Sequence, residues 1–92
     1  MTVDKILTEA AATFKQRNEQ YGDNYKNFGN VMIGIFPRGL HIETPDEWNR
    51  LWLFVQIISK ATRYAANMER GGHEDSAHDL SVYAAMLQEM TK

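Results

Sequence analysis

The segment that begins at Thr44 constrains the fold more than any other part of the chain. Thr44-Pro45-Asp46-Glu47 combines an N-cap hydroxyl, a proline at the first helical position and a glutamate at the third, which together predict a capping box and a helix start. We expect this helix to continue to Met68 or Glu69, where Gly71-Gly72 ends it. Between Trp48 and Ile58 the helix is apolar on nearly all sides, so it must be covered on all sides. Three companion helices in a 92-residue monomer can scarcely do this, and we therefore expect the helix to form a subunit interface as well.

Two helices are predicted before this segment. The first begins after a possible N-cap at Thr2 and runs to about Asn18, before a turn at Gly22-Asp23. The second covers Tyr25 to Ile35 and is stopped by Phe36-Pro37-Arg38-Gly39, because proline disfavours helix in the residue before it. The first helix has an apolar face with helical spacing, made of Val3, Ile6, Leu7, Ala10 and Phe14.

A last helix is predicted from His73–Asp75 to about Met90. Asp75 and Ser76 can each serve the free N–H groups of its first turn. Its expected buried stripe consists of Ala77, Leu80, Ala84 and Leu87. Since no segment has strand-like alternation, the sequence predicts one all-α domain over residues 1–92, a compact bundle of about four helices completed by oligomerisation.

Composition excludes several classes of function. The net charge is −2 and no basic run could neutralise a row of phosphates, so bulk nucleic acid is not an expected partner. The longest apolar run, Leu51 to Val55, is five residues, far below the roughly 20 that span a bilayer. The chain has no cysteine and starts without the blocks of a signal peptide, which predicts a cytoplasmic protein.

Asp75 and Asp79 form the strongest candidate site. Residues four apart lie about 40° apart around a helix, so both carboxylates project from one face. A divalent cation between them would offset their repulsion, and an oxygen-only ligand set suits Mg²⁺ or Mn²⁺. The alternative is that Asp75 is a helix cap, which is favoured for this residue alone, and that Asp79 is solvated or ion-paired.

Candidate anion-binding residues lie on the preceding helices. Lys60 and Arg63 are three apart on the polar side of the third helix, within expected reach of Asp75 and Asp79 across a short connection. They could grip a phosphate beside the metal or simply neutralise the carboxylates. The segment from Arg17 to Phe28 is dense in polar and aromatic side chains, so that Tyr21 or Tyr25 could lie against a base and Arg17 could hold a phosphate. Its composition alone favours an ordinary polar turn.

These residues, in this order and spacing, resemble a known group. The motifs are Ile6 to Ala11, Arg17 through the Tyr21-Gly22-Asp23 turn to Asn27-Phe28, Lys60 to Arg63, and His73 to Ser76 leading into Asp79-Leu80 and Tyr83-Ala84. Together they look like a family of short phage and prophage proteins similar to the MazG-like nucleoside triphosphate pyrophosphohydrolases. The resemblance implies a helical bundle that assembles as a dimer or tetramer. It also implies Mg²⁺-dependent cleavage of a nucleoside triphosphate to a monophosphate and pyrophosphate, with Asp75 and Asp79 as catalytic and metal-binding residues. Lys60, Arg63, Arg17, Tyr21, Asn27 and Tyr83 would bind the substrate.

The chain departs from the enzymes of that group in its carboxylates. Catalytic members carry an E-x-x-E pair on one helix and an E-x-x-D pair on the next. Here the helix from Trp48 to Ala66 has no acidic residue, and Ser76 stands three before Asp79. Two hypotheses follow: a phage-type nucleotide pyrophosphohydrolase, or a protein that binds a nucleotide or a host protein without chemistry, in a homo-oligomer.

Overall fold

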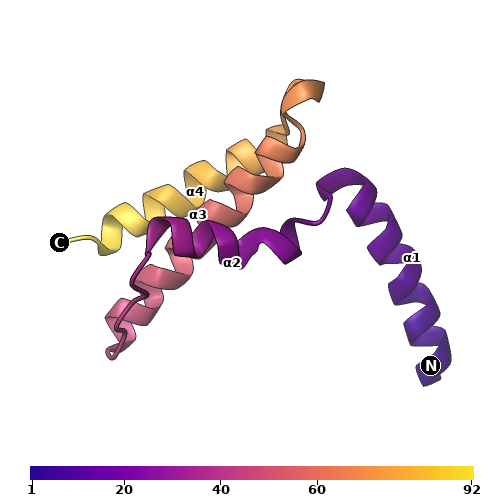
Figure 1. Ribbon diagram of the computed structural model, residues 1–92, viewed down its shortest axis with the longest axis horizontal. Coiled ribbons are helices and arrows are strands. Elements are labelled where there is room, and N and C mark those ends of the chain that lie inside the picture. The colour runs from indigo at the N-terminus through magenta and orange to yellow at the C-terminus, as the bar shows by residue number, and fades with distance from the viewer.

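The computed structural model describes residues 1–92 and contains four α-helices (Figure 1). These are α1 (Val3–Tyr21), α2 (Asn24–Ile35), α3 (Pro45–Ala66) and α4 (Glu74–Met90), with a short 3₁₀ helix η1 (Met68–Arg70) between α3 and α4. No strand is present, so the predicted all-α class with four helices is confirmed. None of the helices has the length and hydrophobicity that crossing a membrane requires.

The body of the molecule is a hairpin of α3 and α4. The two helices lie side by side in Figure 1 and make most of the contacts between elements, while α2 lies across α3. Gly71 and Gly72 reverse the chain between them with φ of +93° at each, a conformation that residues with a Cβ rarely adopt. Leu53 of α3, which is 5% exposed, is the one apolar residue that the chain buries.

The start of α3 follows the prediction. The backbone N–H of Glu47 donates to Thr44 Oγ1 (3.1 Å), and the backbone N–H of Thr44 donates to Glu47 Oε1 (3.1 Å). These two bonds complete the capping box. The hydrogen bond from the Thr44 side chain, followed by that from the Thr44 backbone, lowers the pKa of Glu47 below its ordinary value.

The end of α3 comes earlier than predicted. The helix ends at Ala66, rather than at Met68 or Glu69, because Asn67 changes the hydrogen-bond pattern. Its backbone N–H donates to Tyr64 O, three residues back, and its side-chain amide donates to Arg63 O at 2.9 Å. The chain tightens there into η1.

The cap of α4 corrects one prediction. The N-cap is His73, whose Nδ1 accepts from the backbone N–H of Ser76 (3.3 Å) and lies 2.6 Å from Ser76 Oγ. Ser76 is 2% exposed, which leaves Asp75 in the first turn as an exposed side chain and not as the cap. A histidine ring can take the position because its unprotonated nitrogen is an acceptor like a serine oxygen.

The buried stripe of α4 is also shifted from the predicted one. Ala77 and Ala84 are exposed, whereas Leu80 and Leu87 are half-buried as expected, together with Tyr83. The difference arises because α4 packs against a single helix, α3, so only the narrow face along that contact is covered.

Helix α1 projects from this body (Figure 1). It continues to Tyr21, three residues beyond the predicted end at Asn18, and Thr2 makes no side-chain cap bond. Its apolar face, which includes Leu7 and Phe14, is exposed along its length. The Cα radius of gyration is 16.1 Å, against about 12 Å for a closed domain of this length. The subunit interface on α3 stays a prediction.

Candidate functional site

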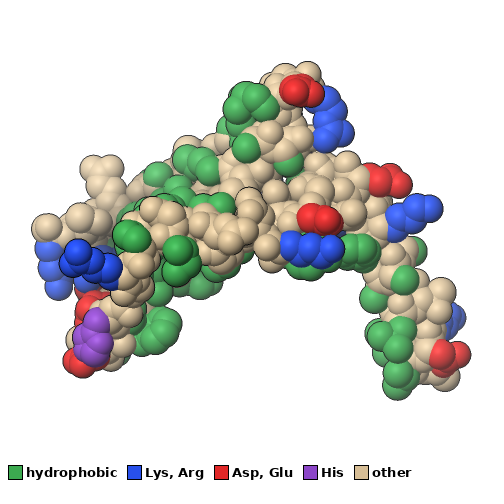
Figure 2. All heavy atoms as spheres, in the orientation of Figure 1, with side chains coloured by type: hydrophobic (Ala, Val, Ile, Leu, Met, Phe, Trp, Pro, Cys, Tyr) green, Lys and Arg blue, Asp and Glu red, His purple; other side chains and the backbone are tan.

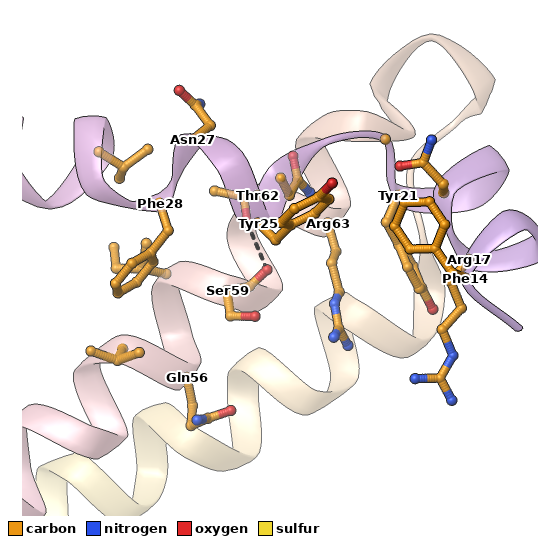
Figure 3. A pocket seen from close by; sticks show the side chains of 16 residues that line it. Phe14, Arg17, Tyr21, Tyr25, Asn27, Phe28, Gln56, Ser59, Thr62 and Arg63 are labelled. Atoms are coloured by element: carbon orange, nitrogen blue, oxygen red, sulfur yellow. Dashed lines mark hydrogen bonds between the residues drawn. The ribbon is translucent and has the colours of Figure 1, made fainter. Parts of the chain in front are cut away.

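A cavity of about 490 Å³ lies where the C-terminal end of α1, the start of α2 and the second half of α3 meet (Figure 3). Three segments form its wall: the end of α1 with the turn that follows, one side of α2, and one face of α3. The lining residues are Phe14, Arg17, Asn18, Tyr21, Gly22, Asn24, Tyr25, Asn27, Phe28, Val31, Val55, Gln56, Ile58, Ser59, Thr62 and Arg63.

The charged groups of this cavity are all cationic. Arg17 of α1 and Arg63 of α3 point to the same side, with Tyr21 between them (Figure 3). The Arg63 guanidinium carbon lies 4.8 Å from the centre of the Tyr21 ring, a cation–π contact. No carboxylate lines the cavity, so nothing within it neutralises the two guanidinium groups. The arrangement favours an anion over a metal ion.

Aromatic rings form a second part of the wall. Phe14 of α1 and Tyr25 of α2 meet edge to face with their ring centroids 6.0 Å apart. Phe28 projects from α2 toward α3 (Figure 3). Such rings offer flat apolar faces against which a planar ligand can stack. Cations and aromatic rings therefore occur in one cavity, contributed by three helices.

The α3 wall contains polar residues that the sequence analysis did not single out. Gln56, Ser59 and Thr62 follow one another at a spacing of three, and the Thr62 hydroxyl donates to Ser59 O at 2.8 Å. Their helical spacing within an otherwise apolar helix was a signal for a polar stripe. On the opposite wall, the Asn24 side-chain nitrogen is buried without a hydrogen-bond partner. Unpaired buried donors are uncommon, so Asn24 is a further candidate for ligand contact.

A junction of polar and aromatic side chains, of which Asn67 is buried, holds α1 against the α3–α4 hairpin. The Asn67 amide, 6% exposed, donates to Gln20 O at 3.4 Å as well as to Arg63 O. The Tyr21 ring meets the His73 ring edge to face at 5.7 Å, and the Gln20 amide lies 3.2 Å from His73 Nε2. These contacts fix the end of α1, and with it the position of Arg17 and Tyr21 in the cavity.

A separate cluster lies along the contact of α3 and α4. Lys60 Nζ is 3.8 Å from Asp79 Oδ2 and 5.9 Å from the centre of the Tyr83 ring. The Lys60 side chain is 13% exposed and that of Asp79 is 48% exposed. None of these residues lines the cavity. The ion pair is one of the alternatives considered from the sequence for Asp79.

The predicted site residues therefore divide into two groups. Arg17, Tyr21, Asn27 and Arg63 line the cavity, although Asn27 points away from α3 (Figure 3) and accepts a hydrogen bond from Asn30. Lys60, Asp79 and Tyr83 lie together on the α3–α4 contact. The expected place of Arg63 beside the carboxylates stays a prediction: its guanidinium stacks on Tyr21 of α1 and forms no ion pair, whereas Lys60, three residues before it, pairs with Asp79.

Metal binding by Asp75 and Asp79 stays a prediction. Asp79 is paired with Lys60, and Asp75 is exposed in the first turn of α4. No group of three histidine, aspartate or glutamate side chains lies close enough in the chain to hold a metal ion. A metal ion bound by Asp75 and Asp79 would complete its ligand set with water or substrate oxygens.

Comparison with known proteins finds similarity to a phage protein. It is 31% identical over 88 residues to the Gene 55 protein of Mycobacterium phage L5, a match that covers 92% of this chain and 51% of that protein. The chain thus spans about half the length of the relative it matches. No family model and no solved structure matches it. Fold and similarity together define an all-helical protein similar to a phage gene product.

Proposed function

We propose that the cavity between α1, α2 and α3 binds a nucleotide or another small phosphorylated ligand. The observation that carries the proposal is the pairing of Arg17 and Arg63 with aromatic rings in a cavity that has no carboxylate. Guanidinium groups bind phosphate oxygens in bidentate fashion, and Tyr21 or Tyr25 offers a face to a base.

The size and charge of the cavity agree with a ligand of this class. Its volume of about 490 Å³ lies within the range of roughly 300–1,000 Å³ usual for small-molecule sites. The chain as a whole carries a net charge of −2, so the two arginines provide a local positive region on an otherwise slightly acidic protein. This combination suits a single nucleotide and disfavours an extended nucleic acid.

Binding without hydrolysis is the version that the residues support best. The MazG-like resemblance implies Mg²⁺ held by acidic residues on neighbouring helices, but α3 contributes no acidic residue beyond its first turn. One of the two carboxylates on α4 is paired with Lys60, and neither lines the cavity. These residues do not fit an Mg²⁺ site within one chain, so we assign no catalytic step to Asp75 and Asp79.

Isothermal titration calorimetry with a panel of nucleoside mono-, di- and triphosphates tests the proposal. Arg63→Ala removes hydrogen bonds to a charged group worth about 1.5–3 kcal/mol, which corresponds to a Kd about 10- to 150-fold higher. Arg63→Lys keeps the charge but loses the planar fork, so we expect a smaller loss. Arg38→Ala is the matched control, because Arg38 lies in the loop between α2 and α3, outside the cavity.

Two results would contradict these proposals. The absence of binding by every nucleotide in the panel and by inorganic pyrophosphate would contradict the ligand site. Pyrophosphate release in the presence of Mg²⁺ that Asp79→Asn abolishes would contradict binding without hydrolysis, since it would assign the carboxylates a catalytic role and make the chain a pyrophosphohydrolase.

A further inference from the structure

The exposed area of the chain is far larger than its mass explains. The solvent-accessible surface is 7228 Å², whereas a closed monomer of 10.6 kDa exposes about 5,500 Å². The excess is about 1,700 Å² per chain, which would give a dimer interface of about 3,500 Å² if two chains covered it for each other. Obligate homodimers bury about 2,000–5,000 Å² in total.

Two apolar surfaces contribute to this exposure. The first is the apolar face of α1, where the Leu7 side chain is 63% exposed. The second lies on the α3–α4 hairpin, where Trp48 is 57% and Trp52 is 55% exposed, and the Trp52 ring meets Tyr83 of α4 edge to face at 5.9 Å. Figure 2 shows hydrophobic side chains along α1 and on the body, with charged groups between them.

Helix α1 cannot cover the hairpin of its own chain while its last turn keeps its contacts. Asn67 holds Gln20, Arg63 stacks on Tyr21, and Tyr21 meets His73. The positive φ of +66° at Gly22 sets the turn that follows. These contacts fix the direction of α1, so that its first turns project away from the hairpin (Figure 1).

We propose that α1 of one chain packs its apolar face on the Trp48–Trp52 face of a second copy. A two-fold axis makes this contact twice, because each chain supplies one projecting helix and one receiving face. A second copy is favoured over an unrelated partner since both halves of the contact are present on the same chain and the excess area falls within the range that obligate homodimers bury. The inference goes beyond the proposed ligand site and does not depend on it.

Sedimentation equilibrium or light scattering tests the assembly. The wild-type chain is expected at twice 10.6 kDa. Leu7→Asp places a charge in both symmetry-related contacts and is expected to raise the dimer Kd by at least about 100-fold. Trp48→Asp on the receiving face should do the same. Gln16→Asp is the matched control, because Gln16 lies on the opposite side of α1 and the substitution makes the same change of charge.

Tryptophan accessibility tests which surfaces meet. The chain has two tryptophans, Trp48 and Trp52, and both lie on the proposed receiving face. Acrylamide should quench their fluorescence more strongly in Leu7→Asp than in wild type or in Gln16→Asp, with helical circular dichroism retained. A monomer at every concentration would overturn the proposal. So would a dimer that Leu7→Asp leaves intact, or one that it dissociates without exposing the tryptophans, since α1 would then pair with another surface.

Discussion

Asn67 is the residue whose replacement best tests how the candidate site is held together. Its side chain is 6% exposed and donates to Arg63 O (2.9 Å) and to Gln20 O (3.4 Å), so it joins the end of α3 to the end of α1. Asn67→Ala removes both hydrogen bonds. A net contribution of about 0.5–1.5 kcal/mol per neutral bond, with the longer bond at the low end, gives an expected loss of about 1–2 kcal/mol.

Urea unfolding measures this loss in the free energy of unfolding, and hydrogen exchange locates it. We expect faster amide exchange in the last turn of α1 and in η1, with smaller changes in the hairpin, because the lost bonds connect α1 to the hairpin and not the hairpin to itself. Asn49→Ala is the matched control, since Asn49 is an exposed asparagine on the same helix. Equal effects of the two substitutions, or an Asn67→Ala variant with unchanged exchange in α1, would refute this account of the junction.

Three other predictions concern stability. Leu53→Ala removes the one buried apolar side chain and should lower the free energy of urea unfolding by about 2–3 kcal/mol. This is the low end of the range for core leucines, because the half-exposed neighbours of Leu53 allow the site to collapse. A loss below about 1 kcal/mol would contradict the role of Leu53 as the core. The pKa of Glu47 is lowered by the Thr44 side chain, so its contribution to stability is present above the unfolded value of 4.5 and is lost as the pH falls through the folded value. Glu47→Gln should therefore flatten the acid limb of a plot of urea midpoint against pH, and an unchanged acid limb would argue against the capping box. Gly72→Ala places a Cβ 2.5 Å from the Tyr64 ring at a φ of +93° and should therefore destabilise the chain by more than about 1 kcal/mol. An unchanged melting temperature would contradict that geometry.

The sequence predicted those features that local chemistry decides. The capping box at Thr44 and Glu47 depends on residues three positions apart and is present in the structure. Gly71 and Gly72 form the turn before α4 as expected, although α3 itself ends earlier, at Ala66. The cap of α4 was assigned to the wrong residues because a histidine acceptor, His73, is favoured there by its contacts with Gln20 and Tyr21 from α1. Contacts so distant in sequence leave no periodic signal.

The candidate site was predicted only in part for the same reason. Arg17, Tyr21 and Arg63 were selected for their side-chain chemistry, and the structure brings them to one cavity. The approach of Arg17 and Tyr21 to Arg63 depends on the angle at which α1 leaves the hairpin, which no local pattern specifies. Residues three apart differ by about 60° around a helix, so the spacing alone does not decide whether Lys60 and Arg63 contact the same neighbouring helix or different ones.

Chemical-shift mapping on the isotope-labelled chain tests the central claim most directly. Titration with a nucleoside triphosphate, first without and then with Mg²⁺, should perturb the amides of the α1–α2 turn around Tyr21 and of α3 from Gln56 to Arg63, already in the absence of the metal. Arg63→Ala should remove these perturbations, and Arg38→Ala should not. Perturbations confined to the start of α4 around Asp75 and Asp79, and present only with Mg²⁺, would contradict the assignment of the cavity as the nucleotide site.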